Sequence, residues 1–381
     1  MKRIGIVLAV CLLLSMLPVT AGAVDMQIKG KSALLMDIAT GTVLYEQNAH
    51  ERLAPASVTK VMTMLLIMEA IDSGKIGWDD VVIASEAAAA KGGSQIYLKV
   101  GESMRVTDMV KSIAVSSAND CACAMAEHIA GSEAAFVEMM NSRAAELGMK
   151  DTHFVNCTGL DDDPAAKEHL TSAYDIAVMS RELMKNHPDI QKFTTIWMDT
   201  VRNGEFGLSN TNKLVRFYPG ATGLKTGFTS AAGYCLSATA QRNGLGLVAV
   251  VMGCETSQDR FGACKQLLDY GFANYALVNP EIEVLTVPVK LGTADSVRAV
   301  PKEAVQLLVD KAQVNQVLVR TELEEQLSAP VSKGQRLGTL TVKVGEQTVT
   351  QIPMVAEEAV PRLTWWDIFR IVLGRFAMAK G

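Results

Sequence analysis

The chain has few of the residues on which metal, redox and nucleic-acid chemistry depend. Its 381 residues include only five histidines, and no C-x-x-C pair or cysteine–histidine spacing typical of a metal site occurs. No basic stripe is present, and the formal net charge is −5, so we expect no nucleic-acid partner. Tandem repeats and low-complexity segments are also absent. We therefore expect a globular protein that uses neither metal nor cofactor.

Aromatic residues are scarce as well, at 6% of the chain, whereas methionine occurs 19 times and is interpreted as core filler. Six cysteines lie beyond the N-terminal segment: Cys121, Cys123, Cys157, Cys235, Cys254 and Cys264. Four of them sit in apolar stretches, where a thiol behaves as a small hydrophobic group. We therefore favour free, buried thiols over a disulfide framework, although export would permit disulfides.

The N-terminus reads as a targeting segment at residues 1–23. Lys2 and Arg3 precede an apolar run from Ile4 to Pro18, and Ala21-Gly22-Ala23 supplies small residues for cleavage. The alternative is an uncleaved membrane anchor, but the run is short for a membrane span. We expect a cleaved secretory signal peptide and an exported mature protein.

Residues 24–278 are predicted to form one domain in which strands flank a helical middle. A hairpin is expected at Ser32–Met36 and Val43–Glu46, and Asn243-Gly244 signals a second hairpin late in the segment. The remaining predicted elements are helices at Ser57–Asp72, Leu170–Asn186 and Ser257–Ala276, a mostly helical stretch that includes Val106–Ile129 and Glu133–Leu147, and strands at Gly233–Ala240 and Leu245–Gly253.

After Asn279-Pro280 the sequence changes to short β-rich runs that alternate with turns. Residues 279–360 are therefore predicted to form a small β-sandwich domain. Strands are expected at Glu283–Val289, Gln316–Glu322, Leu337–Val344 and Gln347–Pro353. The segment Lys302–Asp310 fits a helix or a strand equally well. No residue pattern in this domain indicates chemistry.

The last segment, residues 361–381, is predicted to be an amphipathic helix. At 100° per residue, one face carries Trp365, Ile368, Phe369, Val372 and Phe376, and Asp367 and Arg370 lie opposite. Charges within the run argue against a span, whereas the paired tryptophans suit a helix in the bilayer interface. We therefore expect residues 362–380 to bind a membrane surface; the alternative is a helix docked on its own protein.

A serine and a lysine three residues apart form the first motif with chemical meaning. In Ser57-Val58-Thr59-Lys60, both functional side chains share one face of a predicted helix. A serine hydroxyl needs a base beside it, and an exposed lysine is protonated. Burial and the nearby charge of Lys225 are expected to lower the pKa of Lys60 and free its lone pair. Alone, an S-x-x-K string is weak evidence, because composition yields about one by chance.

The second motif, Ser117-Ala118-Asn119, falls in a predicted loop between helices. Ser117 is expected to pass a proton from the leaving group towards Lys60, and the Asn119 amide to bind Lys60 and a substrate carbonyl. A helix N-cap is the alternative role for these residues, and both roles can hold at once.

The third motif, Lys225-Thr226-Gly227, precedes an extended stretch. Lys225 and Thr226 suit a carboxylate, and Gly227 would let a ligand backbone approach an edge strand. A phosphate loop is excluded, because Leu224 precedes the lysine and the G-x-x-x-x-G-K spacing is missing. The three motifs together predict acyl transfer by a serine nucleophile.

This motif set resembles that of the serine penicillin-recognising enzymes. Longer strings make the chain similar to D-alanyl-D-alanine carboxypeptidases, which are low-molecular-mass penicillin-binding proteins: Leu53–Lys60, Val155–Leu160, Thr171–Asp175 and Gly223–Thr229. The resemblance is close over residues 26–276 and looser beyond them. It implies an α+β fold with a β-lactamase/transpeptidase-like domain, in which helices flank an antiparallel sheet and form a helical subdomain.

The resemblance also implies roles for the motif residues. Ser57 would attack the terminal D-Ala-D-Ala bond of peptidoglycan stem peptides, with the backbone N–H groups of Ser57 and Phe228 as the oxyanion hole. Lys225 and Thr226 would hold the carboxylate of the leaving D-alanine, and water would release the acyl-enzyme. β-Lactam antibiotics would be covalent inhibitors. The enzyme would act at the outer face of the cytoplasmic membrane, in the periplasm or cell-wall space.

Two positions bear on the alternatives. Related carboxypeptidases often carry histidine after K-T-G, whereas this chain has Phe228, so its substrate preference is expected to differ. Glu182 is compared with the deacylating glutamate of class A β-lactamases, but Lys185 stands where leucine is expected, and we interpret Glu182 as a solvated helix residue. A DD-carboxypeptidase is preferred over a β-lactamase or DD-endopeptidase, and over a penicillin-binding sensor or scaffold with a vestigial site.

Overall fold

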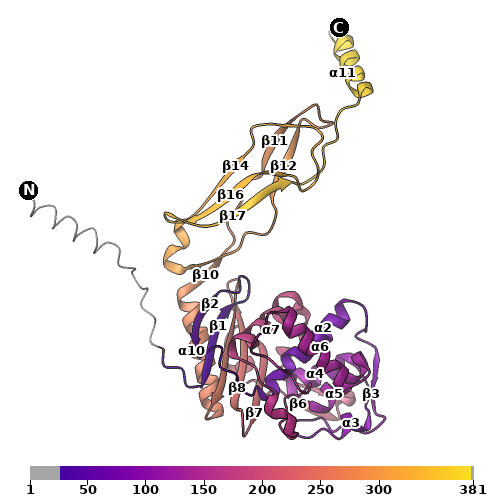
Figure 1. The fold of residues 1–381 in the computed structure, drawn as a ribbon, viewed down its shortest axis with the longest axis vertical. Coiled ribbons are helices and arrows are strands. Elements are labelled where there is room, and N and C mark those ends of the chain that lie inside the picture. The colour runs from indigo at the N-terminus through magenta and orange to yellow at the C-terminus, as the bar shows by residue number, and fades with distance from the viewer. Residues whose placement is uncertain (1–25, 379–381) are drawn as a thin grey trace, which may run out of the picture.

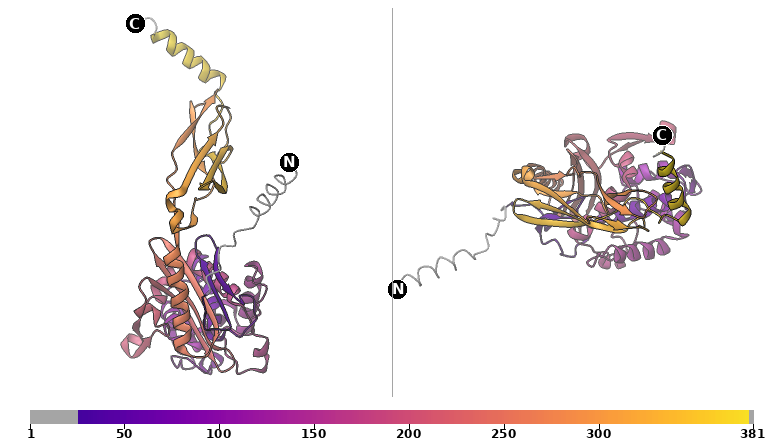
Figure 2. Two further views of the ribbon diagram at one scale, coloured as in Figure 1. Left: turned by 90° about the vertical axis from the view of Figure 1, so that its left-hand side faces the viewer. Right: turned by 90° about the horizontal axis from the view of Figure 1, so that it is seen from above.

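The computed structural model describes residues 26–378, so the predicted signal peptide lies outside the described residues. Two bodies follow one another along the chain, and a terminal helix projects from the far end of the second (Figures 1 and 2). The first body is built on a five-stranded antiparallel sheet of strand order β2-β1-β9-β8-β7. Its strands are β1 (Ser32–Asp37), β2 (Val43–Gln47), β7 (Ala221–Thr229), β8 (Gly233–Arg242) and β9 (Leu245–Cys254).

Both predicted hairpins are confirmed, as β1–β2 and β8–β9. The second turns at Asn243 and Gly244, which both have positive φ (49° and 83°), as a tight hairpin turn requires. Strand β7 forms one edge of the sheet, so one side of its backbone is open to another chain.

Helices cover both faces of this sheet. Successive side chains of a strand point to opposite faces, and in β1 and β9 the side chains on both faces are apolar. Leu34 and Val250 belong to the core shared with α2 (Lys60–Asp72) and α7 (Ala173–Asn186). Leu35 and Val251 belong to the opposite core, which packs against α10 (Ser257–Asn274).

A helical subdomain lies beside the sheet on the α2 side, at the right in Figure 1. Its elements and the following connections, with 3₁₀ helices labelled η, are η1 (Ala56–Thr59), β3 (Val81–Ile83), α3 (Glu86–Ala89), β4 (Ser103–Arg105), α4 (Val106–Ser116), α5 (Asn119–Ala130), α6 (Glu133–Glu146), η2 (Pro164–Glu168), η3 (Pro188–Ile190), α8 (Gln191–Thr194), β5 (Met198–Val201), η4 (Arg202–Gly204), β6 (Phe206–Ser209) and α9 (Leu214–Phe217).

The second body is β-rich and β-sandwich-like, as predicted. Its main sheet has six strands in the order β14-β16-β17-β12-β11-β15. The elements are β10 (Tyr275–Val278), β11 (Leu285–Lys290), β12 (Ser296–Pro301), β13 (Leu307–Asp310), η5 (Lys311–Gln316), β14 (Val317–Leu323), β15 (Leu327–Ser328), β16 (Arg336–Val344) and β17 (Gln347–Ala356). The α+β fold class is therefore confirmed.

The segment that the sequence left open, Lys302–Asp310, contains strand β13. This strand pairs antiparallel with β10, which precedes Asn279-Pro280. Leu308 of β13 packs against the core on the α10 side of the first body, whereas Leu307 and Val309 belong to the core of the second body, so this strand joins the two bodies. The six cysteines among the described residues are free and buried, in agreement with the composition argument.

The terminal helix α11 spans Trp365–Met378. Trp365 and Phe369 stack at 5.4 Å with an interplanar angle of 10°, and both are exposed. Figures 1 and 2 show the helix standing away from both bodies. No helix in the part of the chain that the structure describes is long and apolar enough to cross a membrane.

Candidate active site

Ser57 and Lys60 meet at the junction of a 3₁₀ turn and a helix. The sequence predicts Ser57 in the first turn of an α-helix; it lies instead in η1, and Lys60 is the first residue of α2. Lys60 Nζ donates hydrogen bonds to Ser57 Oγ at 3.0 Å and to the Thr158 carbonyl oxygen at 2.8 Å. Its side chain is fully buried.

Burial lowers the pKa of Lys60 to about 7, and the opposing influences of Cys157 and Asp120 are smaller. The predicted cause was burial together with the charge of Lys225; burial is the cause that dominates. An amine with this pKa is largely neutral just above neutral pH, so it can accept the proton of the adjacent hydroxyl.

The carbonyl that holds Lys60 belongs to a tightly braced loop. Asn156 Oδ1 accepts hydrogen bonds from the Thr158 backbone N–H and Oγ1, and from the Gly159 N–H at 2.7 Å. Gly159 has φ +79°, and a Cβ at this position would lie 1.8 Å from the Ala56 carbonyl oxygen. Only glycine fits here, so the loop and η1 hold each other in place.

His169, a residue that the sequence analysis did not single out, contacts η1 through a hydrogen bond to Thr59. His169 Nδ1 accepts a hydrogen bond from the Val155 N–H, so its Nε2 carries the proton that bonds Thr59 Oγ1 at 2.8 Å. Thr59 Oγ1 in turn donates to the Ala56 carbonyl. Burial, followed by His153 and Lys60, lowers the pKa of His169 to about 4, which keeps the ring neutral in this role.

The second motif lies where α4 ends and α5 begins. Ser117 has a left-handed backbone (φ 64°), and Asn119 is the first residue of α5. Ala118 occupies the N-cap position, so the alternative capping role applies to neither residue. The predicted contact between the Asn119 amide and Lys60 is not formed in the described structure: Asn119 Nδ2 donates to the Gly92 carbonyl at 2.7 Å, and Lys60 Nζ bonds Ser57 and Thr158 instead.

Ser117 Oγ and Asn119 Oδ1 are buried and have no hydrogen-bond partner within the described residues. Unpaired polar atoms are costly when buried, so native proteins rarely keep them without a reason. A bound substrate that donates to Asn119 Oδ1 and contacts Ser117 Oγ would supply that reason.

The third motif lies on edge strand β7. Lys225 Nζ donates to the Thr226 carbonyl at 2.9 Å, and Thr226 Oγ1 donates to Thr211 Oγ1 at 2.7 Å. Burial lowers the pKa of Lys225 well below its ordinary value, and the charges of Lys60 and Arg260 add to this. A carboxylate bound beside Lys225 would raise this pKa again and restore its positive charge.

Gly227 has a structural reason that the sequence does not show. A Cβ at this position would lie 2.6 Å from the Pro55 carbonyl oxygen and 3.1 Å from the Ser57 backbone nitrogen. Strand β7 therefore packs directly on η1, and this close approach requires a glycine at position 227. Arg260 fixes the same point, since its Nη1 donates to the Gly227 carbonyl at 2.9 Å.

Phe228 follows on the same strand and is 52% exposed. Its ring lies 4.3 Å from that of Tyr234 on β8. The motif residues thus meet around η1: Ser57 and Lys60 from one side, and Lys225, Thr226 and Gly227 from the adjoining edge strand.

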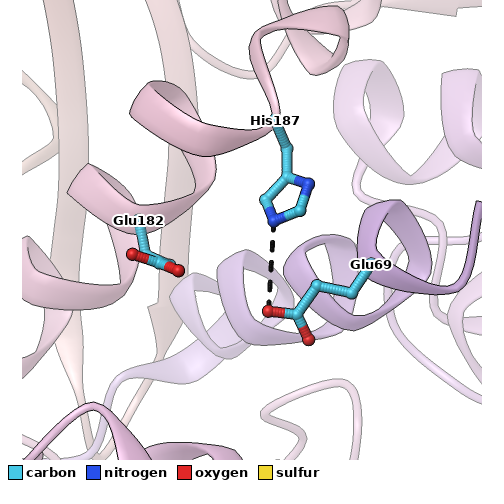
Figure 3. Close-up of side chains that lie close together, drawn as sticks. All are labelled: Glu69, Glu182 and His187. Carbon is cyan, nitrogen blue, oxygen red and sulfur yellow. Dashed lines mark ion pairs between the residues drawn. The ribbon is translucent and has the colours of Figure 1, made fainter. Parts of the chain in front are cut away.

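A separate cluster of acidic and imidazole groups lies between α2 and the end of α7 (Figure 3). Glu69, Glu182 and His187 are spaced as metal ligands could be. However, the Arg143 guanidinium donates to Glu69 and to Glu182, each at 2.8 Å, and so supplies the cationic charge. Glu182 is therefore ion-paired and half-buried, not solvated as the sequence suggested, and its partners are not residues of the serine site.

Comparison with known proteins agrees with this geometry. Residues 19–256 match the D-alanyl-D-alanine carboxypeptidase family, and residues 272–362 match the C-terminal domain of penicillin-binding protein 5. The chain belongs to the D-alanyl-D-alanine carboxypeptidase family. It is 42% identical to the D-alanyl-D-alanine carboxypeptidase DacF of Bacillus subtilis over 92% of this chain and 91% of the relative.

Solved structures extend the similarity to three dimensions. Penicillin-binding protein 5 of Haemophilus influenzae matches 90% of this chain and all of its own, with 31% identity and a TM-score of 0.75. Penicillin-binding protein D2 of Listeria monocytogenes, in an ampicillin-bound form, matches 65% of this chain and 99% of its own, with 32% identity and a TM-score of 0.59. The chain is a serine hydrolase with D-alanyl-D-alanine carboxypeptidase activity.

Proposed function

We propose that Ser57 is the nucleophile of this carboxypeptidase and that neutral Lys60 is its general base. The contact of 3.0 Å between Lys60 Nζ and Ser57 Oγ carries the proposal. As Ser57 Oγ bonds to the carbonyl carbon of the penultimate D-alanine, its proton passes to Lys60. The backbone N–H groups of Ser57 and Phe228 stabilise the resulting oxyanion, an effect worth about 3–4 kcal/mol per donor in other enzymes.

Collapse of this intermediate breaks the peptide bond and gives an ester on Ser57. The leaving nitrogen takes a proton through Ser117, whose buried hydroxyl lacks a protein partner. Asn119 holds the substrate backbone through its unpaired Oδ1. Water then hydrolyses the ester and restores the enzyme.

Lys225 and Thr226 bind the carboxylate of the terminal D-alanine. Both side chains are buried on the edge strand beside η1, and their position favours a substrate that ends there. Phe228 presents an apolar, half-exposed ring at the same edge, so we expect it to tune substrate preference without taking part in the chemistry.

We also propose that the protein is exported by cleavage of residues 1–23 and acts at the outer face of the cytoplasmic membrane. Residues 24–278 would be the catalytic domain, 279–360 the β-rich domain and 361–381 the membrane-binding segment. The exposed Trp365, Trp366 and Phe369 of α11 support attachment to a membrane surface.

The test is release of D-alanine from a peptide ending in D-Ala-D-Ala by purified protein. We expect rapid release by the wild type, none by Ser57→Ala, and normal release by the control Ser73→Ala at the far end of α2. Fast turnover of penicillin instead of the peptide would favour a β-lactamase, and covalent labelling of Ser57→Ala by penicillin would contradict the nucleophile assignment.

A further inference from the structure

An open cleft of about 690 Å³ lies between the loop after α3 and the start of β6. Its walls include Tyr97 and Val100 on one side and Arg202 and Phe206 on the other. Tyr97 is 65% exposed, and its ring meets Phe206 edge-on at 6.4 Å. The Arg202 guanidinium lies 5.3 Å from the centre of the Phe206 ring.

The backbone on both sides of this cleft is strained. Tyr97 has φ 60°, and Arg202 and Asn203 each have φ 55°, values that residues with side chains rarely adopt. Five other described residues share this property: Ala56 and Ser117 of the serine site, and Asn48, Asn243 and Leu291 outside it. Such strain persists only where the surroundings enforce it, and it concentrates at functional sites.

Tyr97 is held in this conformation from both sides. The buried carboxylate of Asp120 accepts hydrogen bonds from the Ile96 N–H at 3.1 Å and the Leu98 N–H at 3.0 Å. Arg202 donates to the Ile96 and Tyr97 carbonyls at 2.7 and 3.2 Å. These hydrogen bonds fix the backbone of Tyr97, while its ring is exposed to solvent. A purely structural role would not require an exposed ring.

The ionic partner of Arg202 completes this support. Glu102 takes two hydrogen bonds from Arg202, at 2.7 and 3.1 Å, and the Arg202 bonds hold the pKa of Glu102 below its usual value. The charges of Arg202 and Glu102 are therefore paired with each other and not available to a ligand. Lys99 and Glu205, at the rim of the cleft, are exposed and can bond a ligand.

Hydrogen bonds connect one wall of the cleft to the second motif of the serine site. Asp120 directly follows Asn119, and the Asn119 N–H donates to the Ser94 carbonyl at 2.7 Å. Tyr97 is three residues beyond Ser94, a distance of at most about 10 Å. Four residues of a stem pentapeptide precede the bond that is cut, and they span up to about 14 Å when extended, so a sugar attached to the peptide would bind within about that distance of Ser57.

We propose that this cleft binds a pyranose of the glycan strand that carries the stem peptide, with Tyr97 as the stacking surface. The inference rests on the proposed function and extends it from the peptide to the attached sugar. The C–H faces of a pyranose are apolar and pack on an exposed aromatic ring, while its hydroxyl and amide groups take hydrogen bonds. The exposed Tyr97 ring and the exposed Lys99 and Glu205 side chains at the rim offer both.

The experiment compares a free pentapeptide ending in D-Ala-D-Ala with the same peptide attached to a disaccharide. Tyr97→Asn removes the ring and keeps a residue that tolerates the left-handed backbone. We expect wild type to have the higher kcat/KM for the sugar-linked peptide, and the ratio of the two values to fall at least fivefold in Tyr97→Asn. The control Phe217→Ala removes a 71%-exposed ring outside the cleft and should leave the ratio unchanged.

Equal losses on both substrates would show that Tyr97 acts only through the loop that positions Asn119, and would overturn the proposal. A wild type without preference for the linked peptide would overturn it as well. If wild type releases no D-alanine from either substrate, the proposed function has failed instead. Calorimetric binding of the linked peptide to Ser57→Ala, with and without Tyr97→Asn, then still tests the cleft: equal affinities would refute it.

Discussion

Lys60 Nζ lies between Ser57 Oγ, at 3.0 Å, and the carbonyl oxygen of Thr158, at 2.8 Å. A neutral amine that donates one N–H to this carbonyl has its lone pair free for the Ser57 proton. The carbonyl therefore orients the base, and the Asn156-braced loop fixes the carbonyl. Base strength and base direction come from two different features: burial sets the pKa, and the loop sets the geometry.

The contact between β7 and η1 predicts that Gly227→Ala is damaging. The added Cβ would meet the Pro55 carbonyl and the Ser57 nitrogen, so the strand and the turn must separate. We expect a loss of about 1–3 kcal/mol in the free energy of unfolding and a tenfold or greater fall in the rate of acylation by penicillin. Urea unfolding and stopped-flow labelling measure the two.

Gly262→Ala is the matched control, because that helical glycine has nothing within 4 Å of the added Cβ. It should acylate at the wild-type rate. Normal acylation by Gly227→Ala would show that η1 does not depend on this close approach.

His169 predicts a pH dependence of stability. Its pKa is about 4 in the folded protein against 6.5 when free, so between these values the unfolded state binds more protons. Stability therefore falls as the pH drops through this window, by about 2 kcal/mol between pH 7 and pH 5 for this group. Urea unfolding at the two pH values measures the change.

The matched variant is His169→Gln, which keeps a side-chain donor for Thr59 but does not titrate. Its loss of stability between pH 7 and pH 5 should be smaller than that of the wild type by about this amount. An equal loss in both proteins would mean that His169 is not held neutral.

The terminal helix predicts reversible attachment to lipid. Deleting residues 362–381 should leave mature protein in the supernatant when anionic vesicles are sedimented, with little loss of activity on soluble peptide. A shorter deletion of 364–381 keeps Arg362 and Leu363, which pair with Gly292 and Leu291 of the β-rich body, and should behave alike. Sedimentation of both truncated forms with the vesicles would remove this role from α11.

The sequence was sufficient for the parts of the site that are local. Ser57 and Lys60 are three residues apart, so any helical turn brings them together, and Asn243-Gly244 fixes its hairpin without help from distant residues. The structure adds that β1 and β9 are near-continuous apolar runs because both faces of the sheet are covered.

The contacts that sequence reasoning missed join segments far apart in the chain. Thr158 is 98 residues from Lys60, and His169 is 110 residues from Thr59. From the sequence alone, Gly227 is interpreted as a glycine that lets a ligand approach the strand. Only the fold shows that the Pro55 carbonyl lies against it. The notable strings around Asn156 and Thr171 indicated that these segments matter, but neither spacing nor periodicity shows which atom they present.

The most direct test of the account is the pH dependence of acylation by penicillin, measured as the second-order rate constant on the full chain. With the pKa of Lys60 at about 7, the rate should fall tenfold for each pH unit below 7 and reach a plateau above it. A rate that keeps rising towards pH 10, or one that does not change between pH 5 and pH 9, would contradict a neutral Lys60 as the base for Ser57.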